Sequence, residues 1–320
     1  MKRAHWLALL GIGILLWAVV FAPAPGATRW IRTLHNSAHA PIFGCVAVLA
    51  LIGLRSSARF ASWRLAAQYG FTLLLTLILG LLTELLQIPT GRDASVDDVL
   101  RDLLGAVAAL GLFALFDEQV RLLSHARAIR IVAGVVGIAA VAVAAAPVTR
   151  AALTYQQRDA RFPVLADFTE RYDRYFILQQ SAEFSPALMP DPWAGRAGER
   201  AMHVRLLQGP YPGLDFIELP PDWSGYSTLA IDLTNPTSLS LQFVVRVHDA
   251  AHNKRVDDRF NRLFELPPRT RRVFRIPLED VAAAPRTRTF DLRQVAGMII
   301  FRVDDSPPVD EIYFSRAWLE

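Results

Sequence analysis

The spacing of apolar and polar positions changes near residue 150. Before that point apolar residues form long runs, and after it they alternate with polar residues in short runs. A run of about 20 apolar residues predicts a helix that crosses a bilayer, whereas alternation predicts half-buried strands. We therefore expect an all-α transmembrane domain (residues 1–150), a linker (151–161) and an external all-β sandwich (162–320).

Five segments of the first half are predicted to cross the membrane. They are Trp6–Phe21, His39–Leu54, Ala67–Ile88, Val99–Phe116 and Ile131–Ala146. The first could instead be a signal peptide, because Lys2 and Arg3 precede its apolar core and Ala22-Pro-Ala24 resembles a cleavage site. Further apolar segments follow at once, which favours a retained helix.

Lysine and arginine are unevenly divided between the loops that join these segments. Eight lie on one side (Lys2, Arg3, Arg55, Arg59, Arg64, Arg121, Arg127 and Arg130) and three on the other (Arg29, Arg32 and Arg92). Cytoplasmic loops are the richer in these residues, so the N-terminus is expected inside. Five crossings then put the β domain on the outer side of a bacterial inner membrane.

Ionisable residues interrupt the apolar pattern around the third and fourth segments. Such groups are costly at the edge of hydrocarbon and tend to be paired and functional. The expected topology gathers six polar residues near the outer surface: His39, Glu84, Gln87, Arg92, Asp98 and Asp102. They could form a structural clamp between helix ends or a site open to an anionic or polar headgroup. A His/Glu/Asp metal site from His39, Glu84 and Asp98 is the less favoured interpretation, because ligand spacing cannot be read across three helices.

The polar residues of this region resemble the VanZ-like membrane family. The matching positions are Glu84, Gln87, Arg92, Asp98, Asp102 and Gly105, with His39 at the start of an earlier helix. An acidic-basic pair that precedes this histidine in the family is replaced here by His35 and Asn36, and Asp102 replaces an asparagine. The resemblance covers Trp6 to Phe116 and implies a link to glycopeptide (teicoplanin) resistance, without a settled activity.

The second half carries the alternation and turn residues of short strands. Nine strands are expected, at Val164–Phe168, Met202–Leu206, Phe216–Leu219, Thr228–Leu233, Leu241–Val247, Leu263–Leu266, Val273–Pro277, Gly297–Val303 and Glu311–Trp318. This number of short strands favours a β-sandwich, and a jelly roll in particular.

Several short motifs of this half resemble galactose-binding-like jelly rolls, which include carbohydrate-binding modules. They are Leu165–Phe168, Pro221–Tyr226, Arg246–Asp249, Asp258–Asn261 and Asp310–Tyr313. Saccharide binding needs an exposed aromatic ring beside planar polar groups, and the candidates are Trp193, Tyr211, Trp223, Tyr226, Asp249, Asn253, Asp258 and Asn261. The alternative is that Trp223 fills the core and that the aspartates cap turns. Asp167 and Glu311 could hold a structural Ca²⁺.

Composition narrows the function further. The net charge is +4 and no basic stripe is interleaved with aromatics, which argues against nucleic-acid binding. The single cysteine, Cys45, excludes an intrachain disulfide. The second half contains no G-x-S-x-G or H-E-x-x-H motif. We therefore expect a non-catalytic envelope protein without a cofactor, whose partners are membrane lipid and an envelope glycan. The alternative is an enzyme or transporter acting on a lipid-linked cell-wall precursor.

Overall fold

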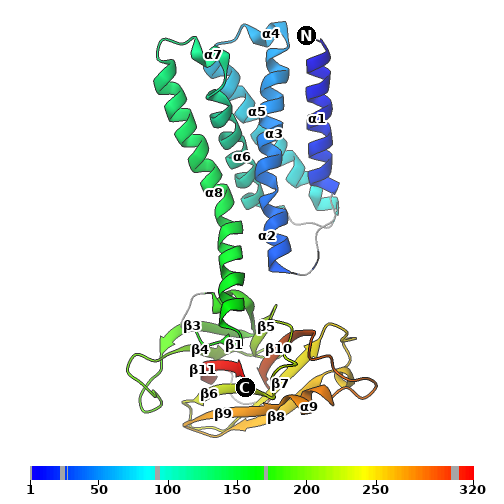
Figure 1. Ribbon diagram of the computed structural model, residues 1–320, viewed down its shortest axis with the longest axis vertical. Helices are drawn as coiled ribbons and strands as arrows, with labels where there is room; N and C mark the ends of the chain where they lie inside the picture. The colour runs from blue at the N-terminus through cyan, green and yellow to red at the C-terminus, as the bar shows by residue number, and fades with distance from the viewer. Residues whose placement is uncertain (1, 22–25, 27, 91–93, 169–171, 304–309) are drawn as a thin grey trace. The chain divides into compact units, whose positions relative to one another are not determined.

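The computed structural model describes residues 2–21, 26, 28–90, 94–168, 172–303 and 310–320. The chain divides into two compact units, Met1–Ala152 and Leu153–Glu320. The first is helical and the second is built mostly of strands (Figure 1). This division agrees with the change in apolar spacing near residue 150.

The described residues of the first unit form nine helical segments, the last of which continues into the second unit. They are α1 (Lys2–Phe21), α2 (Arg29–Ser37), α3 (His39–Arg55), α4 (Ala58–Ala61), α5 (Leu65–Gln87), the 3-10 turn η1 (Ile88–Thr90), α6 (Val96–Ala114), α7 (Glu118–Arg121) and α8 (Ala126–Arg161). Each of the five predicted apolar segments is helical. The segment 151–161, predicted as a linker, is the last part of α8.

Four helical stretches of the described residues are long and apolar enough to cross a membrane. They are Arg3–Phe21, Arg29–Arg55, Leu65–Gln87 and Ala126–Arg161. The fourth predicted span is a helix too, but α6 carries Asp97, Asp98, Arg101 and Asp102 in its first two turns. By length and composition, four of the five predicted spans are candidates to cross a membrane. Helix α6 is not among them, because charged residues occupy its first two turns.

Helix α3 lies among α1, α5 and α6. Its closest approach is to α6, because a Cβ atom on Gly105 would lie only 1.8 Å from the carbonyl oxygen of Ala40. Small residues permit such close backbone contact between apolar helices. This contact fixes the start of α3 against the first turns of α6.

The second unit is an antiparallel β-sandwich. Its strands are β1 (Val164–Ala166), β2 (Ile177–Gln180), β3 (Ala182–Leu188), β4 (Arg200–Leu206), β5 (Gly213–Ile217), β6 (Thr228–Asn235), β7 (Leu241–Asp249), β8 (Phe260–Leu266), β9 (Thr270–Pro277), β10 (Val295–Arg302) and β11 (Asp310–Leu319). Short helical turns η2 (Asp173–Phe176), η3 (Val256–Asp258) and α9 (Leu278–Ala282) join some of them.

The strands form two sheets. The six-stranded sheet has the order β3-β4-β11-β6-β9, with β1 also paired to β11, and the five-stranded sheet has the order β2-β5-β10-β7-β8. The last strand in the sequence, β11, therefore lies inside its sheet between β4 and β6. This non-sequential order is typical of a jelly-roll sandwich rather than a chain of hairpins.

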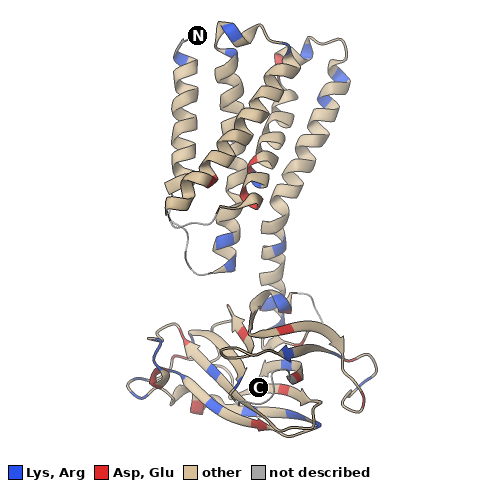
Figure 2. Cartoon of the chain, turned by 180° about the vertical axis from the view of Figure 1, so that it is seen from behind, with Lys and Arg blue, Asp and Glu red and all other residues tan. Residues whose placement is uncertain are grey.

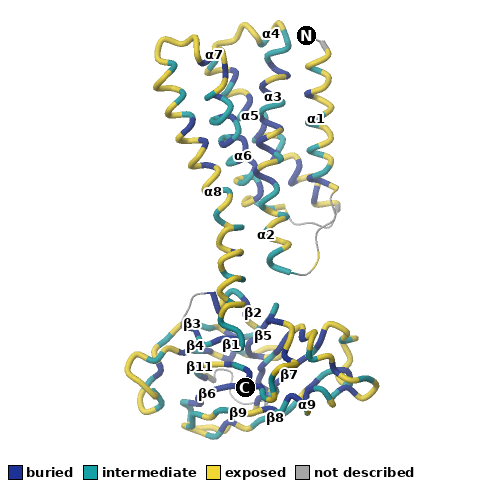
Figure 3. Tube along the Cα trace, viewed as in Figure 1, coloured by how far each residue is buried: buried dark blue, intermediate teal, exposed yellow. Residues whose placement is uncertain are grey.

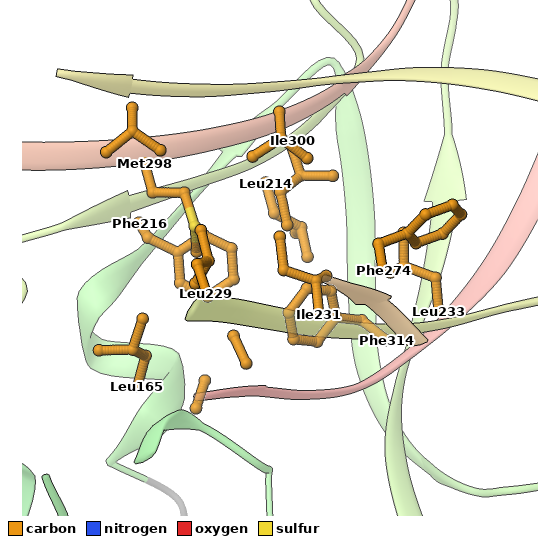
Figure 4. Packing of buried hydrophobic residues seen from close by; sticks show 14 of the residues in the cluster. Leu165, Leu214, Phe216, Leu229, Ile231, Leu233, Phe274, Met298, Ile300 and Phe314 are labelled. Carbon is orange, nitrogen blue, oxygen red and sulfur yellow. The ribbon is translucent and has the colours of Figure 1, made fainter. Parts of the chain in front are cut away.

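The core of this unit is formed by the inward residues of both sheets. Strand β7 alternates buried and more exposed positions along its length, as a strand with one face on a core must. Phe216, Ile231, Met298 and Phe314 meet between the sheets (Figure 4). Buried segments of both units are marked in Figure 3.

All nine predicted strands are present, and two more, β2 and β3, were missed. Strand β2 has only four residues, and β3 is an edge strand with mostly exposed side chains and Pro186 near its end. Proline is tolerated at sheet edges because an edge strand need not donate every N–H. Neither strand has the apolar alternation that identified the others.

Candidate functional site

Four of the six polar residues predicted to cluster lie at one end of the helical unit. His39 begins α3, Glu84 lies in the last turn of α5, and Asp98 and Asp102 lie in the first two turns of α6. All four side chains are buried. Acidic residues are sparse on these helices, and most of them lie close together on neighbouring helices (Figure 2).

One direct contact joins two of these side chains, and the other two are held by neighbouring residues. His39 Nδ1 lies 3.0 Å from Asp102 Oδ1, and the backbone N–H of Ser95 donates to Glu84 Oε2 at 2.7 Å. Arg101 forms an ion pair with Asp98. One ring nitrogen of His39 and one carboxylate oxygen each of Glu84 and Asp98 all lie within 4.8 Å of one another.

Two oxygens of the cluster are buried and unbonded. Glu84 Oε1 and Asp102 Oδ2 have no hydrogen-bond partner within the ranges the structure describes. A Cβ on Gly80 would lie 2.9 Å from Asp102 Oδ2, so α5 packs directly against this carboxylate. Buried, unbonded carboxylate oxygens are costly and call for an explanation.

The other two residues predicted for this cluster, Gln87 and Arg92, are not among the four that lie together. Gln87 is buried and its amide donates to the carbonyl oxygen of Val19 in α1 at 3.0 Å, which ties two helix ends together. Arg92 lies outside the described residues. The structural clamp foreseen for this region therefore fits Gln87, while His39, Glu84, Asp98 and Asp102 form a separate group.

A second buried polar group in the helical unit was not predicted. Asp117 accepts hydrogen bonds from Arg55 at 2.8 Å and from the hydroxyl of Tyr69 at 2.7 Å. Arg55 also donates to Gln68. The sequence signal was a charge directly after each of two apolar segments, and these contacts satisfy the carboxylate oxygen that the arginine and the tyrosine share.

In the β-sandwich, Trp223 is part of the core. Its side chain is fully buried, and its indole N–H donates to the carbonyl oxygen of Pro220 at 2.8 Å. A ring without exposed surface cannot stack on a sugar, so the predicted platform role of Trp223 is wrong. Tyr226 is half-buried, with its ring edge-on to Phe162 at 5.3 Å between centroids.

Asp249 and Asp258 are also structural. Arg288 donates to both carboxylates of Asp249 and Asp258, at 2.5 Å and 2.6 Å for its shortest bonds. The hydrogen bonds from Arg288 and from the backbone of Asn253 lower the pKa of Asp258 to about 2. Burial alone would raise the pKa of Asp249, but its bonds from Arg288 and Asp291 lower it. Because both carboxylates are buried and bonded, neither is available to a saccharide.

Tyr211 and Asn261 come together on the five-stranded sheet through Arg246. The guanidinium carbon of Arg246 lies 5.1 Å from the exposed Tyr211 ring, and its Nε donates to Asn261 Oδ1 at 3.2 Å. Asn253 is exposed in the loop before β8, where its side chain accepts from the backbone N–H of Arg255. Tyr211 is thus the predicted aromatic that is exposed beside planar polar groups.

A pocket of about 590 Å³ lies on the outer side of the six-stranded sheet. Arginines and acids line most of it, together with one aromatic ring: Arg196, Arg200, Arg271, Arg316, Asp167, Glu199, Asp232 and Trp318. The guanidinium of Arg316 lies 4.9 Å from the Trp318 ring. A bulge between Phe314 and Arg316 re-aims the strand at this point.

Arg271 organises one wall of this pocket. It donates to Glu199 at 2.6 Å, to Asp232 at 2.7 Å and to the carbonyl oxygen of Trp193 at 2.7 Å. The hydrogen bonds from Arg271 hold the pKa of Glu199 below its usual range. Trp193, a predicted platform, is half-buried and contributes its backbone here, while its indole N–H donates to Arg269. The sequence offered one signal, the alternation of Arg316 and Trp318 in the last strand.

The predicted calcium ligands each pair with a basic side chain. Asp167 binds Arg161, and Glu311 lies 2.7 Å from His203 Nε2. Among the described residues, the carboxylate and histidine side chains that lie close enough together to hold a metal ion are those of His39, Glu84 and Asp98. The calcium prediction therefore finds no support from these two contacts.

Comparisons with known proteins concern the second half of the chain. No family model matches, and no curated protein matches in sequence. Solved structures that match include a family 11 carbohydrate-binding module from Clostridium thermocellum, bound to a β-1,3-1,4-mixed-linked tetrasaccharide. It has 14% identity and a TM-score of 0.35, and the match covers 49% of this chain and 93% of that one.

Two enzymes match over the same share of this chain. An exo-β-agarase has 20% identity and a TM-score of 0.39, with 49% of this chain and 25% of that chain covered. The endo-1,4-β-xylanase 10B of Clostridium thermocellum has 9% identity and a TM-score of 0.33, with 49% and 28% covered. The VanZ-like resemblance of the helical half stays a prediction.

Proposed function

We propose that this chain is a multi-pass membrane protein of the bacterial cell envelope whose β-sandwich binds an acidic saccharide. The binding site is the pocket on the six-stranded sheet. The observation that carries this proposal is the combination, in one pocket, of the Trp318 ring with Arg200 and Arg316, neither of which forms an ion pair in the part of the chain that the structure describes.

The chemistry of the pocket suits such a ligand. An aromatic face contacts the C–H surface of a sugar ring, and guanidinium groups bind carboxylate or phosphate with two parallel hydrogen bonds. The pocket is lined by four arginines and three acids, so the charge of its lining is +4 − 3 = +1. A volume near 590 Å³ lies in the range of small-molecule sites, about 300–1,000 Å³.

Membrane attachment would confine this pocket near its ligand. Four apolar helices and α6 supply the anchor, and the loop charges favour an N-terminus inside and a sandwich outside. Tethering raises the effective concentration of a binding domain toward a surface polymer. A reporter fused after Glu320 should be active only outside the cytoplasm, and activity on the cytoplasmic side would remove the envelope assignment.

Binding can be tested with the full chain in detergent. Acidic oligosaccharides carrying uronic acid or phosphate are titrated against neutral ones of equal length, with affinity measured by calorimetry. Arg316→Gln and Arg200→Gln should each weaken binding of the acidic ligands about tenfold, as expected for loss of a charge-assisted hydrogen bond. The matched control is Arg205→Gln, on the same strand as Arg200 but paired with Glu183 at the surface.

Two outcomes would contradict the proposal. One is the absence of binding to every oligosaccharide at millimolar concentration by folded protein. The other is equal binding by the wild type and both pocket variants. If Tyr211→Ala abolishes binding while the pocket variants do not, the ligand lies on the five-stranded sheet instead.

The buried polar group of the helical unit favours a second candidate, an enzyme or transporter for a lipid-linked cell-wall precursor. Paired ionisable residues within apolar helices are costly and tend to be functional. Glu84→Ala should then abolish glycopeptide tolerance or precursor turnover while the chain still folds. An unchanged phenotype would leave the helical unit as an anchor.

A further inference from the structure

The polar group at the start of α3 and α6 carries an excess of negative charge. Three carboxylates are buried there, Glu84, Asp98 and Asp102, and the one cation in contact with them among the described residues is Arg101. Counting a neutral His39, the charge is −3 + 1 = −2. Buried charge of this size is costly unless it is compensated, and one divalent cation would compensate it.

The histidine is held in the orientation that metal ligands require. Its Nδ1 is bonded to Asp102 at 3.0 Å, which leaves Nε2 as the ring nitrogen that remains for a metal. Ligating histidines almost always donate their other ring N–H to a carboxylate or carbonyl, which fixes the ring and raises its basicity. Asp102 fills that supporting role.

The two carboxylates are placed as the other ligands. Glu84 uses Oε2 to accept from Ser95 and keeps Oε1 buried and without a hydrogen-bond partner in the described part of the chain. The candidate ligand atoms of His39, Glu84 and Asp98 lie within 4.8 Å of one another. Ligands about 2.1 Å from one ion lie roughly 3 to 4 Å apart, so small rotations of the side chains would close the site.

We propose that His39, Glu84 and Asp98 bind one divalent transition-metal ion, with Asp102 as the positioning residue for His39. One imidazole and two carboxylates suit Zn²⁺ or Mn²⁺ better than Ca²⁺, which takes oxygen ligands. Three protein ligands leave a position for water or substrate, as in catalytic rather than structural zinc sites. This site is separate from the saccharide pocket, so either proposal can fail alone.

The test uses the full chain in detergent, stripped with a chelator and titrated with Zn²⁺. Wild type should bind one equivalent, with a rise in the thermal unfolding temperature. Glu84→Gln keeps the size and the acceptor for Ser95 but removes the charge, and should weaken Zn²⁺ affinity at least 100-fold. Asp102→Asn should weaken it about 10- to 100-fold, as for other residues that support a metal ligand.

The matched control is Asp117→Asn, which disturbs the other buried polar group of the same helical unit and should leave Zn²⁺ affinity unchanged. Co²⁺ serves as a second probe, because its visible absorption bands report nitrogen and oxygen ligation in the wild type whether or not a variant folds. Absence of saturable one-to-one binding by the folded wild type would overturn the proposal. Equal affinity in wild type and Glu84→Gln would assign the metal to adventitious surface groups and overturn it too.

Discussion

Replacing Trp223 by alanine tests whether this ring is core or ligand platform. The side chain is fully buried among the residues between the two sheets, and its N–H bonds the carbonyl oxygen of Pro220. Truncating a buried tryptophan costs about 3–5 kcal/mol through lost transfer energy and the cavity left behind. The lost hydrogen bond adds about 1 kcal/mol. We expect the unfolding free energy of the sandwich to fall by about 4–6 kcal/mol.

Hydrogen exchange of the full chain in detergent measures this loss in the relevant strands. Amides of β6, β7 and β10 that exchange only by opening of the whole sandwich should exchange faster by roughly three to four powers of ten, since 1.36 kcal/mol corresponds to a factor of ten. Complete loss of protection is the limiting form of the same result. Protection in α3 and α5 should be unchanged, because these helices belong to the other unit.

Two further variants sharpen the test. Trp223→Phe keeps most of the packing and should cost about 1–2 kcal/mol. Trp193→Ala is the control, because this ring is half-buried in a loop and should cost less than about 1 kcal/mol. If Trp223→Ala exchanges within tenfold of the wild type, the ring does not support the core and the reasoning from its burial is wrong.

Three other outcomes follow from the described contacts. Arg288 holds the pKa of Asp258 at about 2. The contribution of Asp258 to the free energy of unfolding is therefore fully present above about pH 4 and is lost as pH falls toward 2. Arg288→Met should reduce this loss of stability when the free energy of unfolding is measured as a function of pH. Burial raises the pKa of Asp173 to about 6. The contribution of Asp173 to the free energy of unfolding is therefore largest below about pH 4 and falls by up to about 3 kcal/mol as pH rises through 6. Asp173→Asn should remove that decline in stability. Gly105→Ala should lower the unfolding temperature in detergent, since its Cβ would overlap α3, whereas Gly70→Ala, with open space around it, should not; equal temperatures would refute the close contact.

Much of the fold follows from apolar spacing alone. The break between the units, the five helical segments and nine strands could be predicted, because each has a strong period and a core to face. The missed strand β3 is an edge with few buried side chains. Apolar residues alternate along a strand because one of its faces is buried, so a strand without a buried face has no such pattern in its sequence.

The polar group of the helical unit could be predicted, because the order of the helices sets which helix ends lie together. The pocket of the sandwich could not, because loops place its residues. His39, Glu84, Asp98 and Asp102 lie at helix termini whose order along the chain already sets their common end. The pocket around Arg271 depends on a loop, on a bulge and on pairing between strands distant in sequence, none of which has a local pattern. Trp223 and Asp258 resembled ligand groups because aromatic and acidic residues in turns serve burial as often as binding.

The place of β11 has a consequence for the order of folding. Its neighbours β4 and β6 were made more than 70 residues earlier, and they have no partner between them until it arrives. A nascent chain that ends before residue 310 would therefore carry a split half-sheet with two open edges, the kind of surface that recruits other strands. Synthesis and assembly of this domain are thus coupled through β11, and a chain that stops before residue 310 should aggregate instead of folding as a shortened sandwich.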